Sequence, residues 1–313
     1  MKAKLFFTIF LATFAALLIS SAQTPPSTPS TGARPNIIII LADDMGYSDL
    51  GCYGSEIHTP NIDALAASGV KMSQCYNTAR CCPSRAELMT GLFPPQAGIA
   101  DMTNEQSPGA NKDDPPAYTG ELSKNTVTIA EALHGAGYAT LMTGKWHLGQ
   151  FDQSLWPLQR GFERYYGSLY GAIKYFYPTA PRIITQDNTP VPVPQSTTDR
   201  QFYTTDAFTD HAIDFLKDEA AGKKRPFFLY LAYNAPHWPL QAFDDDLAKY
   251  RGKYMSGWDV LRQARYQRQI ANGLIDPKWH LSPRTPSLPA WDSLSPQKKG
   301  RYGFAHVDLC GAG

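Results

Sequence analysis

Two adjacent cysteines open the stretch CCPSRAELMTG (81–91), in which Arg85 follows one turn later and a short helical run ends at Gly91. A helix N-terminus binds anions and lowers the pKa of a thiol. The Arg85 guanidinium adds a fixed charge whose geometry suits tetrahedral oxyanions. The stretch therefore predicts a site that holds an anion beside a reactive side chain. The alternative, two buried cysteines acting as small apolar residues, leaves the arginine unexplained.

Polar residues also follow three apolar segments that are predicted strands. The first, NIIIILADDMG (36–46), is a continuous β-branched run, as expected for a strand buried on both faces. The second is YATLMTGKWHLG (138–149) and the third is PFFLYLAYNAPHWPLQ (226–241). Their ends carry Asp43 and Asp44, then Lys145 and His147, then Asn234 and His237.

Predicted helices alternate with these strands. They cover residues 59–69, residues 128–137, with a Thr128/Glu131 capping box, and residues 205–222, which have one apolar face. Alternation of this kind predicts an α/β fold with a mostly parallel sheet flanked by helices on both faces. Because ligands bind outside the carboxyl ends of such strands, the polar residues above are expected at one edge of the sheet.

Each of these groups has a second interpretation. Adjacent carboxylates at Asp43 and Asp44 suit Ca²⁺ or Mg²⁺, but aspartate is also a common helix N-cap. Lys145 and His147 could face one pocket, or could be a surface lysine beside a packed histidine. A proline-bounded loop presents His237 for acid/base work, or holds it for a structural reason. His134 and His211 lie on predicted helices and are expected at the surface.

Composition narrows the possible classes of protein. The 313 residues carry a net charge of +1 and show no basic stripe, which argues against nucleic-acid binding. Five cysteines in a chain of this length do not form a disulfide scaffold, although Cys52 and Cys75 could pair. No cysteine or histidine spacing indicates a structural zinc site.

The N-terminus resembles an export signal. Residues 1–22 combine lysines, a short apolar run and small residues before Gln23, so we expect cleavage and no stable membrane anchor. Residues 23–35 are rich in Pro, Ser and Thr and are interpreted as a linker. These features predict a periplasmic or extracellular protein.

The order of motifs resembles the type I sulfatases, closest to their bacterial arylsulfatase branch. Residues 81–91 match that family's C-x-P-S-R-x-x-x-x-T-G signature, a specific pattern. Further segments agree in order: PNIIIILADDMGYSDLGCYG, TPNIDALAASGV, TGKWHLG, GFERYYG and APHWPLQ. The resemblance runs from about residue 35 to about residue 295 and implies an alkaline-phosphatase-like sulfatase fold.

The resemblance implies a role for each residue of the expected site. Cys81 would be converted to formylglycine by a maturation enzyme, and its hydrate would attack a sulfated small molecule or glycan. Asp43, Asp44 and residue 81 would bind Ca²⁺, with Mg²⁺ as the other candidate. The remaining expected site residues, which bind sulfate, support the hydrate or protonate the leaving alcohol, are Arg85, Lys145, His147 and His237.

The chain also departs from the family. Family members are longer, and their second half supplies further metal ligands and a small antiparallel subdomain. Residues 36–299 are therefore interpreted as the N-terminal portion of a catalytic domain, and 300–313 as an aberrant or truncated tail that loses its helical pattern from Gly300. The 313-residue chain alone is expected to be unstable or inactive.

Two other functions remain open on the sequence. One is a phosphatase or phosphonate monoester hydrolase of the same superfamily, and the other is a non-catalytic chain that binds sulfated glycans. Substrate identity cannot be read from the sequence, although segments 101–125, 168–200 and 249–292 are candidate pocket walls.

Overall fold

A computed structural model describes residues 34–103, 115–194, 196–197, 200–222 and 225–311, with side chains described as far as residue 303. The chain divides into two units, Met1–Pro35 and Asn36–Gly313, and every helix and strand named below belongs to the second. The predicted signal peptide and most of the predicted linker lie outside the described residues.

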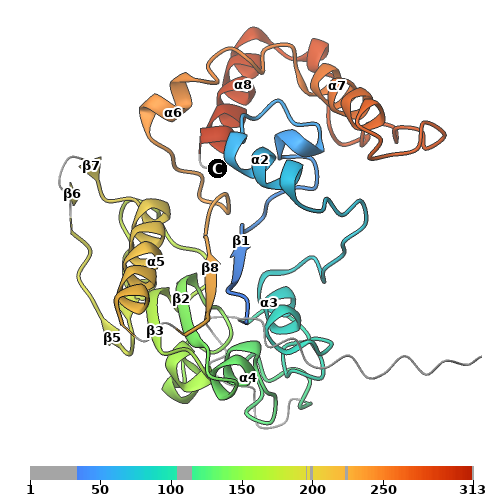
Figure 1. Ribbon diagram of the computed structural model, residues 1–313. Coiled ribbons are helices and arrows are strands. Elements are labelled where there is room, and N and C mark those ends of the chain that lie inside the picture. The colour runs from blue at the N-terminus through green and yellow to red at the C-terminus, as the bar shows by residue number, and fades with distance from the viewer. Residues whose placement is uncertain (1–33, 104–114, 195, 198–199, 223–224, 312–313) are drawn as a thin grey trace, which may run out of the picture. The chain divides into compact units, whose positions relative to one another are not determined.

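A six-stranded sheet organises the second unit, with strand order β1-β8-β2-β3-β4-β5 (Figure 1). The first four strands in this order are parallel to one another, and β4 and β5 extend the sheet as an antiparallel hairpin. The mostly parallel sheet predicted from the sequence is confirmed. The strands are β1 (Ile37–Leu41), β2 (Ala139–Lys145), β3 (Arg164–Ser168), β4 (Thr185–Gln186), β5 (Thr189–Pro190) and β8 (Phe227–Ala232), and a separate ribbon pairs β6 (Ser196–Thr197) with β7 (Arg200–Gln201).

Helices cover both faces of the sheet, as the alternation predicted. One apolar cluster joins Met142, Phe228 and Tyr230 to helices α3 and α4, and a second joins the neighbouring Leu141 and Leu229 to α5. Successive residues of a strand point to opposite faces, so each strand supplies both clusters. The helices are α2 (Pro60–Ser68), α3 (Cys81–Thr90), α4 (Ile129–Gly135), α5 (Thr204–Ala221), α6 (Asp244–Ala248), α7 (Trp258–Ala271) and α8 (Pro296–Gly311), with short 3₁₀ turns η1 (Gly51–Tyr53), η2 (Gln153–Leu155), η3 (Pro157–Arg160) and η4 (Trp291–Ser293).

The structure shows the local features behind two short sequence patterns, the capping box of α4 and Gly144 in β2. The capping box predicted for α4 is present: Thr128 Oγ1 accepts from the Glu131 amide, and the Glu131 carboxylate accepts from the Thr128 amide. Gly144 allows the close approach of β2 and β8, because a Cβ atom there would lie 1.8 Å from the Ala232 carbonyl oxygen. Of the helices in the described part of the chain, none combines the length and apolar content needed to cross a bilayer.

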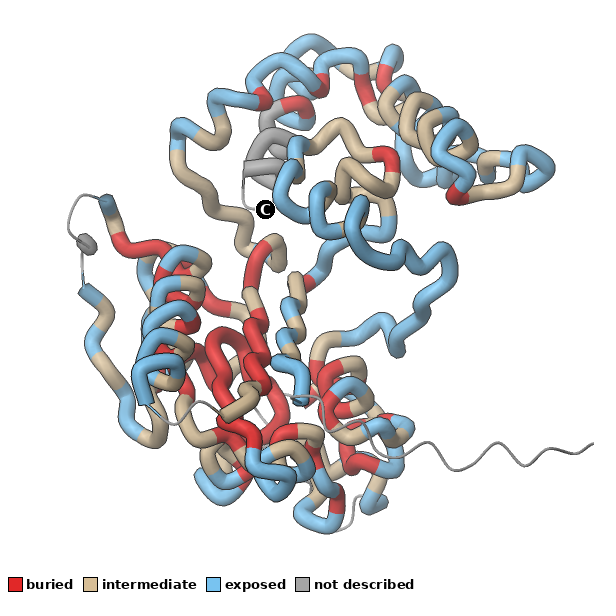
Figure 2. The backbone as a smooth tube through the Cα atoms, viewed as in Figure 1, coloured by how far each residue is buried: buried red, intermediate tan, exposed pale blue. Residues whose placement is uncertain are grey.

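The expectation that the first strand is buried on both faces is wrong. β1 is an edge strand, and Ile38 and Ile40 on its open face are 50% and 60% exposed, whereas β2 and most of β8 are buried (Figure 2). A continuous apolar run predicts that a segment is a strand, but not whether that strand lies at the centre or at the edge of the sheet.

Two further expectations are corrected. Helical structure does not end near Gly300, because α8 continues to Gly311. The His211 imidazole is half-buried rather than at the surface, since it stacks on the Tyr166 ring with centroids 3.5 Å apart. His134, in contrast, has an exposed side chain, which pairs with Glu163.

Candidate active site at the carboxyl edge of the sheet

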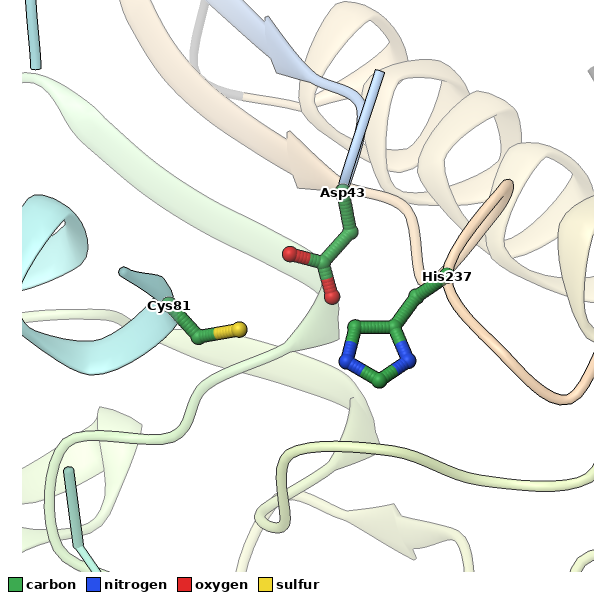
Figure 3. Close-up of side chains that lie close together, drawn as sticks. All are labelled: Asp43, Cys81 and His237. Atoms are coloured by element: carbon green, nitrogen blue, oxygen red, sulfur yellow. The ribbon is translucent and has the colours of Figure 1, made fainter. Parts of the chain in front are cut away.

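Three side chains from separate elements meet at the carboxyl edge of the sheet (Figure 3). Asp43 follows β1, Cys81 is the first residue of α3, and His237 lies in the loop after β8. One potential ligand atom from each lies within 4.8 Å of the others. Helix α3 begins at Cys81, so the thiol itself occupies the helix N-terminus.

The Asp43 carboxylate is the anionic centre of the site. It is 5% exposed, and its Oδ2 accepts a hydrogen bond of 2.5 Å from Lys145 Nζ. Its Oδ1 lies 3.4 Å from Arg85 Nη2. Burial on its own would raise the pKa of Asp43, but the charges of Arg85 and Lys145 outweigh it, and the pKa is lowered. Asp43 is therefore ionised at neutral pH.

Asp44 occupies a different environment from its neighbour. Its backbone is in the left-handed region, with φ of 63°, and its side chain is 52% exposed. The Asp44 Oδ2 atom lies 3.5 Å from His237 Nε2. The turn thus separates the two carboxylates: one contacts buried cations and the other contacts the histidine.

Arg85 crosses the interior of the site. Its Nη1 donates to the Lys145 carbonyl at 2.8 Å and to the Tyr230 hydroxyl at 3.2 Å, and the residue is 1% exposed. Its Nη2 has no hydrogen-bond partner among the described residues, although Asp43 lies within ion-pair distance. A buried guanidinium with an unsatisfied donor is suited to binding an anion.

His147 is buried behind these charges. Burial, followed by the charges of Lys145 and Arg85, lowers its pKa well below the usual value, so its imidazole is neutral at pH 7. Its Nδ1 atom has no hydrogen-bond partner within the described part of the chain. Gly171 packs against the ring, since a Cβ atom there would lie 2.6 Å from His147 Cε1.

Cys81 and His237 shift each other's pKa in opposite directions. A hydrogen bond with His237 lowers the pKa of the Cys81 thiol, and the same bond raises the pKa of the imidazole. His237 Nδ1 lies 2.5 Å from the Trp238 carbonyl oxygen, which can only accept, so Nδ1 carries the proton. The Tyr175 hydroxyl donates to the His237 carbonyl and fixes the loop.

The neighbouring Cys82 points into the core and has a different environment. Its Sγ atom accepts from the Thr103 amide at 3.2 Å and lies 3.7 Å from Met102 Sδ. Burial raises the pKa of this thiol. Cys52 and Cys75, for which the sequence left a pairing open, are both free thiols.

All seven residues expected from the sequence therefore lie in one site. Three others were missed: Tyr230, Tyr175 and Gly171, which orient Arg85, the His237 loop and His147. Tyr230 is one aromatic residue in an apolar strand, so nothing in the surrounding sequence indicates its hydrogen bond with Arg85. Asp49, which lies in the loop after β1, accepts a hydrogen bond from the Gly46 amide and pairs with Arg265.

Comparisons with known proteins show which family the chain is similar to. Residues 35–285 match the family model described as Sulfatase. The chain is 35% identical over 274 residues to "Arylsulfatase" of Klebsiella aerogenes, covering 85% of this chain and 56% of that protein. The chain spans about half the length of the curated relatives it matches.

Two solved structures are similar in both fold and sequence. The crystal structure of Ps i-CgsB in complex with k-i-k-neocarrahexaose matches with a TM-score of 0.60 and 31% identity, over 88% of this chain and 56% of that one. The structure of BT4656 in complex with its substrate D-glucosamine-2-N,6-O-disulfate matches with a TM-score of 0.53 and 27% identity, over 69% of this chain and 37% of that one.

Proposed function

Because this chain belongs to the sulfatase family, we propose that it cleaves sulfate monoesters, with residue 81 as the position of the nucleophile. The observation that carries the proposal is the meeting of Cys81, Asp43 and His237 at the carboxyl edge, backed by the buried cations Lys145 and Arg85. Hydrolysis adds water across the ester and yields an alcohol and inorganic sulfate.

The donor atoms of the site bear on which cation it could hold. Ca²⁺ takes six to eight oxygen ligands, and the thiol of Cys81 is a poor one. Asp43 and Asp44 supply carboxylate oxygens, and residue 81 would supply oxygen once converted to formylglycine. The set therefore fits Ca²⁺ or Mg²⁺ in the matured protein, where the cation would offset negative charge on the sulfate.

Arg85 and Lys145 are proposed to bind the sulfate group. Both are fully or almost fully buried, so their charges act with little solvent screening. The Arg85 Nη2 donor that lacks a hydrogen bond in the described structure is available to a sulfate oxygen. A formylglycine hydrate at residue 81 would supply the attacking hydroxyl, and Arg85 and Lys145 would hold the sulfate oxygens beside it.

The two histidines are proposed to move protons in opposite directions. His237 is half-buried, lies beside residue 81 and has its Nε2 atom 3.5 Å from Asp44 Oδ2, which suits a general acid for the leaving alcohol. His147 has a lowered pKa and a buried nitrogen without a hydrogen-bond partner in the described chain, which suits a proton acceptor. We propose that it would accept the proton of the second hydroxyl at residue 81, so that the aldehyde re-forms and inorganic sulfate leaves.

Sulfated carbohydrates are the proposed substrate class, with aryl sulfates as convenient test substrates. Two similar structures, at 31% and 27% identity, carry oligosaccharide or sulfated amino-sugar ligands. Export through residues 1–22 and conversion of Cys81 by a formylglycine-generating enzyme belong to the same proposal. A tryptic mass map of protein from its native host tests both, through its new N-terminus and the mass of the Cys81 peptide.

The activity test compares the two adjacent cysteines. The chain is coexpressed with a formylglycine-generating enzyme, and sulfate release is measured from 4-nitrophenyl sulfate, with 4-nitrophenyl phosphate in parallel. Robust release by the purified 313-residue chain would refute the expectation that it is inactive on its own. Cys81→Ala should abolish any release, whereas Cys82→Ala, a change of the buried neighbouring thiol, should keep it at reduced protein stability.

Two outcomes contradict the proposal. Faster release of phosphate than of sulfate identifies a phosphatase of the same superfamily. Tight binding of sulfated sugar without sulfate release, in protein shown by mass spectrometry to carry the aldehyde, identifies a binding protein.

A further inference from the structure

We propose that a cationic pocket beside this site binds a second anionic group of the substrate, so that the protein prefers sugars with two negative groups. This inference rests on the proposed function and adds a specificity determinant to it. The pocket has a volume of about 180 Å³ and is lined by Ala172, Ile173, Lys174, Thr179, Arg182 and Pro239.

Two of the segments that line the pocket also carry residues of the candidate site or residues that pack against it. Ala172 directly follows Gly171, the residue that packs against the His147 ring. Pro239 lies two residues beyond His237 in the loop that Tyr175 fixes. In our proposal, a ligand whose sulfate lies at residue 81 extends past these two segments into the pocket.

Charge favours an anion in this pocket. Lys174 and Arg182 both line it, and none of its six lining residues is acidic. Arg182 Nη1 donates to the Ala172 carbonyl at 2.9 Å, which holds the guanidinium against the wall. The same arginine contributes to the lowered pKa of His147, so its charge reaches the catalytic site. Asp44, the exposed carboxylate of the site, is paired with His237.

Size indicates which part of a substrate the pocket takes. Sites for whole drug-sized ligands measure roughly 300–1,000 Å³, so a cavity of about 180 Å³ suits a substituent rather than a complete sugar unit. Trp238, between His237 and Pro239, is 72% exposed. Its indole offers an apolar surface for the sugar ring that joins the two anionic groups. A sulfate or a carboxylate is thus the group expected in the pocket.

Binding to the unmatured chain tests this inference, because Cys81 in its thiol form leaves the ligand intact. Affinities are measured by calorimetry for galactose 6-sulfate, galactose 4,6-disulfate and galactose 2,6-disulfate. We expect at least one disulfate to bind about tenfold more tightly than the monosulfate, with a preference that shrinks as salt rises. Lys174→Ala should remove most of that preference and change monosulfate affinity less than about twofold.

Lys217→Ala is the control, since Lys217 is an exposed lysine that pairs with Asp214 on α5. It should leave all three affinities unchanged. Equal affinity for all three sugars, or a disulfate preference that survives Lys174→Ala, overturns the pocket and leaves the proposed function standing. Failure of every sulfated sugar to bind overturns the pocket as well, whereas the proposed function is decided separately by sulfate release from the matured protein.

Discussion

Replacing one buried oxygen by an amide nitrogen at residue 43 tests the electrostatics of the site. Asp43→Asn keeps the shape of the side chain but leaves two buried cations, Lys145 and Arg85, without their shared anion. Removing one partner of a buried ion pair costs about 3–5 kcal/mol, because the remaining charge is buried and uncompensated. We expect a loss of that size in the free energy of unfolding at pH 7, measured by urea titration.

The adjacent carboxylate provides a matched control. Asp44 is 52% exposed and lies 3.5 Å from His237, so Asp44→Asn should cost about 0–1 kcal/mol. A cost for Asp43→Asn of about 1 kcal/mol or less, equal to that of Asp44→Asn, would refute the reasoning.

The same pair of variants gives a pH signature. The folded-state pKa of Asp43 is lowered from 3.8, so its stabilising contribution is present above about pH 4 and is lost as pH falls through the folded pKa. The difference between wild type and Asp43→Asn should therefore be constant near neutrality and shrink in acid. A difference that grows as pH falls has the wrong sign for a depressed carboxylate.

Two further predictions concern neighbouring residues. Gly171→Ala should cost about 1–3 kcal/mol in urea unfolding, because its Cβ would press on the His147 ring, whereas Gly135→Ala, which meets open space, should cost nothing; equal effects would contradict this packing. Iodoacetamide labelling of Cys81, followed by mass spectrometry across pH, should have a midpoint below pH 9.0, and His237→Ala should raise it; an unshifted midpoint would exclude His237 as the cause.

The sequence alone determined the type of fold and predicted which residues form the candidate site. Apolar runs that end in polar residues, alternating with capped helices, were sufficient to predict a mostly parallel sheet with its site at the carboxyl edge, because parallel strands place those ends together. The C-x-P-S-R spacing identified Cys81 among the cysteines. These features depend on residues that are close together in the chain, so they can be recognised in the sequence without the fold.

Only the tertiary structure decided where each element lies and what each charge contacts. IIIIL has the same apolar content in any strand, so exposure of Ile38 and Ile40 depends on which elements cover that face of the sheet. The pairing of Asp43 with Lys145, 102 residues away, separates it electrostatically from Asp44 beside it. Long-range contacts of this kind set burial and pKa, and no short stretch of sequence encodes them.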